Sequence, residues 1–217
     1  MSPANSSAAR VSSRRRSSGR RRTAARRRRG IWIAAGGVTA VVLVILTAPL
    51  FNRAIENFSL PLRDQDIIRE QAADKHLDPA LVAAVIYAET KFDPRPSSAG
   101  AEGLMQILPQ TAEFLARRSG AKTFTLTDLA TPAVNIAYGS YYLRYLLDEY
   151  GGSKLLALAA YNGGEANVDQ WLAAARSRGQ RLTVEQIPFP ETRAYVEKVL
   201  QAQRDYRRAY PTELGYR

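Results

Sequence analysis

A single carboxyl group stands among apolar residues in the segment of residues 79–94, PALVAAVIYAETKFDP. Leu81, Val85 and Glu89 follow one another at spacings of four, so in a helix Glu89 projects from the apolar face. Burial and the negative C-terminal end of a helix both disfavour the ionised form, so the pKa of Glu89 should be raised. A raised pKa is what a general acid at neutral pH requires.

The alternative for Glu89 is structural. A buried carboxylate can pair with a buried Lys or Arg and hold helices together, and the spacing alone leaves both interpretations open. Asp93 lies beside Pro94, where we expect a turn or a cap. Glu102 stands between glycines and should face solvent, which leaves Glu191 as the other candidate carboxylate.

Three further segments carry side chains that suit a carbohydrate. Gln106 lies among apolar residues, so it needs hydrogen-bond partners, which either the core or a sugar can supply. Tyr161 and Asn162 precede two glycines at an expected helix end, and an aromatic face suits the apolar face of a pyranose. Core packing of Tyr161 and helix capping by Asn162 are the alternatives. Glu191 falls in the first turn of an expected helix, where it would also complement the helix dipole.

The elements that must position these residues are helices almost throughout. Apolar residues recur at helical spacing, and Pro and Gly mark helix starts and stops, with Asp78 as an expected N-cap. His76 should lie at the surface or in a C-terminal cap. We therefore expect an all-α domain of residues 64–210 with no convincing strand, followed by a C-terminal tail of residues 211–217. The helices are expected near residues 65–76, 79–91, 109–118, 132–149, 153–160, 165–177 and 190–209.

The composition excludes several classes of site. Of the 31 Lys and Arg residues, 11 are arginines within residues 1–30, which leaves 20 basic against 20 acidic residues in the rest of the chain. This balance argues against a folded nucleic-acid-binding domain. The chain has no Cys and one His, which excludes disulfides, thiolate metal sites, a Cys nucleophile and a multi-His metal site. We therefore expect no metal and no cofactor.

The N-terminal region is expected to be a disordered basic tail followed by a membrane anchor. Residues 1–30 are too poor in apolar residues to fold. Residues 31–51 contain no charge and are long enough for a single transmembrane helix. The preceding arginines place the N-terminus in the cytoplasm and, after a stalk of residues 52–63, the domain on the outer side of the membrane. The arginines are expected to contact anionic lipid rather than nucleic acid. A signal peptide cleaved near Thr47 is the alternative.

Together the motifs resemble the catalytic domain of lytic transglycosylases, a family related in fold to goose-type lysozyme. The resemblance spans roughly residues 64–209 and implies a lysozyme-like helical fold. Thr90, where the family pattern has Ser, and Leu108, where it often has Met, are the two departures. The matching motifs are Glu89-Thr90, Phe92-Asp93-Pro94, Gly100-Ala101-Glu102-Gly103-Leu104-Met105-Gln106, Pro109-Gln110-Thr111-Ala112, Asn135 with Gly139 and Tyr142-Leu143, Ala160-Tyr161-Asn162, and Glu191-Thr192-Arg193 with Tyr195-Val196.

The resemblance implies roles for these residues. Glu89 falls on the position of the catalytic acid and base of the family. The positions that contact the substrate are Ser97, Gln106, Tyr161, Asn162 and Glu191. The positions expected to be structural are Asn135, Gly139 and Arg193.

The implied substrate is the glycan strand of peptidoglycan, cleaved at the β-1,4 bond between N-acetylmuramic acid and N-acetylglucosamine with a 1,6-anhydro product. No protein partner is indicated. A goose-type lysozyme-like hydrolase, which would place a water at C1, remains an alternative. A scaffold that binds the cell wall without catalysis is a further alternative.

Overall fold

The computed structural model describes residues 60–94, 97 and 99–216, and the regular elements in this part of the chain are helical. An antiparallel bridge between Glu102 and Ile107 is the one β-type pairing among the described residues. The expectation of an all-α domain is therefore confirmed for them. The elements are α2 (Gln65–Asp74), α3 (Pro79–Thr90), α4 (Pro109–Ser119), η1 (Leu126–Ala130), α5 (Pro132–Glu149), α6 (Lys154–Gly163), α7 (Glu165–Ser177), η2 (Val184–Gln186) and α8 (Pro190–Ala209), of which η1 and η2 are 3-10 helices.

The expected tail of residues 1–30, the expected span of residues 31–51 and most of the expected stalk lie outside the described residues. Among the helices that are described, none is both long enough and apolar enough to cross a membrane.

The helix boundaries follow the Pro and Gly signals closely. A proline is the first residue of α3, α4, α5 and α8, where its missing N–H costs no helical hydrogen bond. The helix α2 ends two residues before the expected position, and the exposed His76 that follows has a positive φ of 50°. The helix α6 continues to Gly163, beyond the expected end at residue 160, and the chain leaves the helix only at Gly164.

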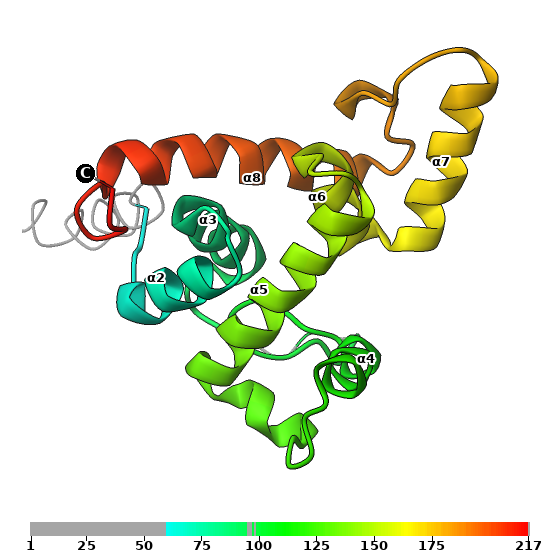
Figure 1. Ribbon diagram of the computed structural model, residues 1–217. Helices are drawn as coiled ribbons and strands as arrows, with labels where there is room; N and C mark the ends of the chain where they lie inside the picture. The colour runs from blue at the N-terminus through cyan, green and yellow to red at the C-terminus, as the bar shows by residue number, and fades with distance from the viewer. Residues whose placement is uncertain (1–59, 95–96, 98, 217) are drawn as a thin grey trace, which may run out of the picture. The chain divides into compact units, whose positions relative to one another are not determined.

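The helix α3 forms the centre of the core. Its residues from Ala80 to Ile86 are at most 1% exposed on every side of the helix, as expected for a helix that is apolar all round. The helix packs against α8 along one side and against α2 along another, while α6 contacts α5, α7 and α8 (Figure 1). This arrangement surrounds α3 with other helices and leaves Glu89 near its C-terminal end.

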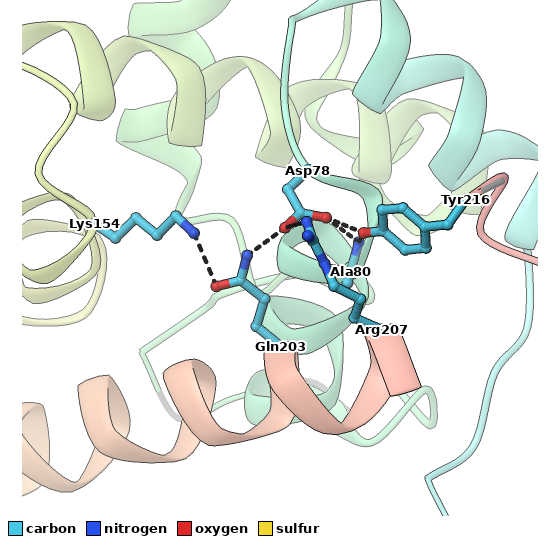
Figure 2. Close-up of polar contacts among 6 residues, drawn as sticks. All are labelled: Asp78, Ala80, Lys154, Gln203, Arg207 and Tyr216. Atoms are coloured by element: carbon cyan, nitrogen blue, oxygen red, sulfur yellow. Dashed lines mark hydrogen bonds and ion pairs between the residues drawn. The ribbon is translucent and has the colours of Figure 1, made fainter. Parts of the chain in front are cut away.

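Asp78 holds the N-terminus of α3 in place (Figure 2). Its carboxylate caps the helix by accepting a hydrogen bond of 3.0 Å from the Ala80 N–H. The same carboxylate accepts hydrogen bonds from the Gln203 amide and the Tyr216 hydroxyl and pairs with Arg207 at 2.6 Å. The N-cap expected from the sequence is confirmed, and its partners come from α8 and from the segment that follows it.

Residues 211–216, expected to be a tail, pack against the helical unit. Leu214 is 2% exposed and belongs to the core. The Glu213 carbonyl accepts a hydrogen bond of 2.7 Å from the Arg69 guanidinium of α2. The hydroxyl of Tyr210, at the end of α8, donates one of 2.5 Å to the Leu60 carbonyl. The C-terminal segment therefore contacts α2, and the end of α8 contacts Leu60, the first described residue.

Candidate active site

Glu89 lies in the last turn of α3 and is half-buried. Burial removes water from its carboxyl group, and this desolvation is the largest cause that raises its pKa, to about 7. The negative charge of Glu191 acts in the same direction, while the Tyr195 hydroxyl and the Lys198 ammonium lower the pKa. The raised pKa expected for a carboxyl group on the apolar face of a helix is confirmed.

The alternative role of Glu89, a buried ion pair between helices, has no support within the described part of the chain. The ion pairs of 4.0 Å or less between described residues all join other groups. The charge of Lys198 reaches Glu89 only as an electrostatic influence on its pKa. A half-buried carboxyl group with a pKa near neutrality can both donate and accept a proton.

Two tyrosines face Glu89 from different helices. Tyr195 of α8 is buried, and its hydroxyl makes no hydrogen bond of good geometry, yet it lies close enough to the Glu89 carboxyl to lower that group's pKa. Tyr161 of α6 is also near enough for the charge of Glu89 to raise its pKa, although burial is the larger cause. Burial keeps both phenols protonated, so each can serve as a hydrogen-bond donor.

Tyr161 is held by the turn that contains Gln106. Its hydroxyl donates a hydrogen bond of 2.8 Å to the Met105 carbonyl, and its ring lies 5.2 Å from that of Tyr142. Gln106 has a positive φ of 49°, and its side-chain amide donates 2.9 Å to the Gly103 carbonyl. The turn therefore fixes Tyr161 beside Glu89 and holds Gln106 in a strained backbone conformation.

Asn135 of α5 holds the turn that contains Gln106 in place through its side-chain hydrogen bonds. Its side chain accepts a hydrogen bond of 2.8 Å from the Met105 N–H and donates to the Glu102 and Leu129 carbonyls at 2.9 and 3.0 Å. Gly103 leaves the space for this amide, because a Cβ there would lie 2.1 Å from its nitrogen. Asn135 thus has the structural role that the resemblance implied.

Two other residues bring the turn close to the neighbouring helices. Thr90 donates a hydrogen bond of 2.8 Å to the Leu104 carbonyl, which joins the turn to the end of α3. Gly139 of α5 faces Met105, whose sulfur would lie 2.4 Å from a Cβ at this position. The hydroxyl that Thr90 shares with the Ser of the family pattern therefore makes a hydrogen bond to the turn. A side chain at residue 139 would push the turn away from α5.

Two adjacent pockets share Asn162 and Gly163. The larger has a volume of ≈ 580 Å³ and is lined by Gln106, Tyr142 and Tyr161 among others. The smaller has a volume of ≈ 380 Å³ and is lined by Asn162, Gly163, Phe189, Pro190, Glu191 and Thr192. Glu89 lines neither pocket, but Tyr161 in the first and Glu191 in the second both interact electrostatically with it.

The structure brings most of the expected substrate-binding residues together. Gln106, Tyr161 and Asn162 line one pocket, and the exposed Glu191 lines the next. Ser97 lies in the segment after α3, where its hydroxyl accepts a hydrogen bond of 2.9 Å from the Ala101 N–H. Ser97 therefore belongs to the loop that precedes the turn. This hydrogen bond does not bring Ser97 next to any of the other expected substrate-binding residues.

The sequence reasoning did not single out Tyr195 as a neighbour of Glu89. Tyr195 follows Glu191 by four residues on α8, so both lie on the same face of that helix. The i, i+4 spacing from a suspected site residue was the available signal. Arg193, expected to be structural, donates hydrogen bonds of 3.3 and 2.9 Å to the Ile187 carbonyl.

The family of the chain follows from a comparison with known protein families. The model of the family described as "Transglycosylase SLT domain" matches residues 66–184, more than half of the chain and most of its helical unit. The chain belongs to the transglycosylase SLT domain family. The resemblance inferred from the motifs is thereby confirmed.

Relatives in the transglycosylase SLT domain family are similar to this chain in sequence. The soluble lytic murein transglycosylase of Escherichia coli K12 is 32% identical over 165 residues, which cover 75% of this chain and 25% of the relative. The membrane-bound lytic murein transglycosylase C of Glaesserella parasuis is 29% identical over 163 residues, covering 65% of this chain and 45% of the relative. The chain therefore spans about a quarter of the first relative.

Solved structures agree with this assignment. The 70 kDa soluble lytic transglycosylase of Escherichia coli has a TM-score of 0.65 and 31% identity, and the match covers 73% of this chain and 27% of that chain. An inactive Glu-to-Gln mutant of the lytic transglycosylase Slt from Pseudomonas aeruginosa has a TM-score of 0.63 and 32% identity, covering 69% and 24%. The helical fold is therefore that of the lytic transglycosylases.

Proposed function

We propose that this protein is a lytic transglycosylase that cleaves the β-1,4 bond between N-acetylmuramic acid and N-acetylglucosamine in peptidoglycan. The observation that carries the proposal is Glu89 itself, a half-buried carboxyl group whose pKa is raised to about 7 and which interacts electrostatically with Tyr161 of one pocket and Glu191 of the adjoining one. The family membership supports it, as does the inactivity of a Glu-to-Gln mutant of the Pseudomonas aeruginosa relative.

In the proposed reaction one carboxyl group performs two proton transfers. Protonated Glu89 donates its proton to the glycosidic oxygen as the C1–O bond breaks, and the oxocarbenium-like centre at C1 is stabilised by the neighbouring N-acetyl group and by dipoles of the site. The Glu89 carboxylate then takes the proton of the C6 hydroxyl of the muramic residue. The C6 oxygen bonds to C1 and gives the 1,6-anhydro product, so no water is consumed and Glu89 ends protonated.

The surrounding residues would bind the glycan, while burial keeps Glu89 protonated. Tyr195 has a buried hydroxyl close enough to the carboxyl group to lower its pKa, and Tyr161, whose pKa the charge of Glu89 raises, lines the larger pocket. Gln106, Asn162 and Glu191 present amide and carboxylate groups to the two pockets, where they would hydrogen-bond sugar hydroxyl and acetamido groups. Ser97 would contact the strand from the loop after α3.

Analysis of the products tests this proposal. The full chain in detergent is incubated with purified sacculi, and the fragments are examined by mass spectrometry. We expect fragments that end in 1,6-anhydromuramic acid and are lighter by one water than hydrolysis products. Fragments with reducing muramic ends would instead assign the goose-type hydrolase reaction to the site.

The Glu89→Gln variant separates catalysis from folding. The amide is nearly isosteric with the carboxyl group but cannot donate the proton, so cleavage should fall by at least about 100-fold while the far-UV circular dichroism stays that of the parent. The matched control is Glu197→Gln, an exposed carboxylate of α8, which should cleave like the parent. Cleavage by Glu89→Gln at the parental rate would refute the assignment, and loss of folding would favour a structural role for Glu89.

We further propose that residues 31–51 anchor the protein in the membrane with the N-terminus in the cytoplasm. The charge-free stretch and the arginines before it support this proposal, and one relative is named as membrane-bound. Because the chain has no Cys, single cysteines at Ser12 or Ser177 can be probed with a membrane-impermeant thiol reagent in intact spheroplasts. Labelling at residue 177 alone is expected, and a mature protein that lacks residue 12 would instead indicate a cleaved signal peptide.

A further inference from the structure

Phe189 is an exposed aromatic residue with a fixed orientation. Its side chain is 43% exposed, and Leu126 at 40% is the other exposed large hydrophobic residue in the described part of the chain. The Phe189 ring packs edge-on against Trp171 of α7, with ring centroids 5.0 Å apart and an interplanar angle of 80°. Trp171 is itself 9% exposed, so the exposed ring is supported by a buried one.

The backbone around Phe189 is equally constrained. Prolines stand on both sides of it: Pro188 has a fixed φ of its own, and Pro190, which begins α8, restricts the φ and ψ angles of Phe189. The Phe189 carbonyl accepts a hydrogen bond of 3.0 Å from the Arg193 N–H. The Arg193 side chain also holds the buried Ile187 through its carbonyl at 2.9 Å. Because the segment is already ordered, a ligand would pay little conformational entropy to use the ring.

The exposed ring borders the smaller of the two pockets. That pocket has a volume of ≈ 380 Å³, and its lining residues include Asn162, Glu191 and Phe189. The volume lies in the lower part of the range of roughly 300–1,000 Å³ for small-molecule sites. A sugar residue has an apolar face and polar edges, so it fits a wall that combines one aromatic ring with an amide and a carboxylate.

We propose that Phe189 forms a carbohydrate subsite in which its ring stacks on a sugar residue of the peptidoglycan strand. Asn162 and Glu191 hydrogen-bond the hydroxyl or acetamido groups of the same sugar. The subsite adjoins the larger pocket at Asn162 and Gly163, so a strand that passes Glu89 continues into it. This inference rests on the proposed function, because it takes the glycan strand as the occupant.

Binding to an inactive protein tests the subsite without cleavage of the ligand. A soluble tetrasaccharide fragment of peptidoglycan is titrated into the full chain carrying Glu89→Gln, in detergent, and the affinity is measured by calorimetry. Adding Phe189→Ala should weaken binding about 10-fold, as expected for the loss of one stacked ring. Phe189→Tyr should bind within about 3-fold of the parent, because the ring is kept.

Two further variants keep the result interpretable. Phe189→Leu retains an apolar side chain against Trp171 and should preserve the fold, but it should lose affinity as Phe189→Ala does. Leu126→Ala removes the other exposed hydrophobic side chain and should leave the affinity unchanged. Far-UV circular dichroism checks that each variant is folded.

The possible failures of the two proposals differ. If the Glu89→Gln protein binds the tetrasaccharide and both Phe189→Ala and Phe189→Leu bind it equally well, the Phe189 subsite is refuted while the proposed function stands. If the Glu89→Gln protein does not bind the tetrasaccharide, the subsite is refuted, and the products that the parent releases from sacculi decide the proposed function separately.

Discussion

The ammonium group of Lys198 donates a hydrogen bond of 2.6 Å to the backbone carbonyl of Ala88, the residue directly before Glu89. That carbonyl lies in the last turn of α3, whose final carbonyl groups have no partners within the helix. The ammonium also lies 5.6 Å from the centre of the Tyr87 ring. A single side chain of α8 thus caps α3 and brings a positive charge close to Glu89.

Replacing Lys198 by Met should shift the pH dependence of activity. Without the positive charge the pKa of Glu89 rises, so the protonated acid persists to higher pH, and the alkaline fall of kcat/KM moves upward. The shift should be a fraction of a pH unit because Lys198 is exposed and solvent screens its charge. The pH–rate profile on soluble glycan measures this. Lys198→Arg should keep the parental profile, and an alkaline limb that moved downward in Lys198→Met would contradict this account.

The raised pKa of Glu89 should also appear in the stability of the protein without substrate. The folded state holds the Glu89 proton up to a pH of about 7, whereas the unfolded chain releases it near 4.5, so the free energy of unfolding falls as pH rises between these values. The fall from this residue is at most about 3 kcal/mol. Urea unfolding from pH 4 to 8 measures it, and Glu89→Gln should become more stable relative to the parent as pH rises. A difference that did not change with pH would show that the carboxyl group titrates normally.

The Tyr195→Phe variant provides a second test of the raised pKa of Glu89. Because the Tyr195 hydroxyl lowers the pKa of Glu89, its removal should raise that pKa further and extend the fall in stability to higher pH. The same urea titration measures this extension. An unchanged titration in this variant would indicate that the hydroxyl does not reach the carboxyl group in solution.

Asn135→Ala should lower the free energy of unfolding of the protein. The change removes the side-chain partner of the Met105 N–H and the Leu129 carbonyl, and buried groups of this kind cost roughly 1–3 kcal/mol each, while the Glu102 carbonyl keeps its hydrogen bond from the Ile107 N–H. We expect the free energy of unfolding to fall by about 3 kcal/mol or more. Chemical denaturation measures this loss. Asn167→Ala, which removes one hydrogen bond of 2.7 Å to the Gly163 carbonyl, is the control and should cost about 1 kcal/mol.

Asp78→Asn should weaken the N-terminal end of α3 in a pH-dependent way. Partial burial acts to raise the pKa of Asp78, but hydrogen bonds from Tyr216, Gln203, Ala80 and Arg207 outweigh it, and the pKa is lowered from 3.8. The charged form therefore stabilises the fold above pH 3.8, and this contribution disappears as pH falls through the folded-state pKa.

The stability of Asp78→Asn relative to the parent should accordingly depend on acidity. We expect it to be less stable at pH 7 by about 2 kcal/mol, with the difference narrowing in acid. Thermal unfolding at several pH values measures the difference. Tyr216→Phe, which keeps the carboxylate but loses one donor to it, should lose about 1 kcal/mol. A difference between Asp78→Asn and the parent that widened in acid would show that the lowered pKa is wrong.

The sequence predicted the helical elements well because their signals are local. A proline at the first position and an apolar period of 3.6 residues depend only on neighbours in the chain, so the start of α3 at Pro79 was predictable. The burial of Glu89 was predictable for the same reason. The C-terminal ends were less certain, and α6 runs on through Tyr161 and Asn162 because its helical hydrogen bonds persist up to Gly164.

The tertiary structure alone decided which groups face Glu89. Tyr195, Lys198 and Tyr161 come from α8 and α6, far from α3 along the chain, and no local pattern encodes how these helices cross. The same holds for Phe189, whose exposed ring packs against Trp171 of α7, a helix that precedes it in the chain by more than ten residues. The sequence therefore determined the helix of Glu89 and the apolar face from which this residue projects, because helix periodicity is a local property. Packing decided which groups set the proton affinity of Glu89 and which residues line the two pockets, because these depend on contacts between distant segments.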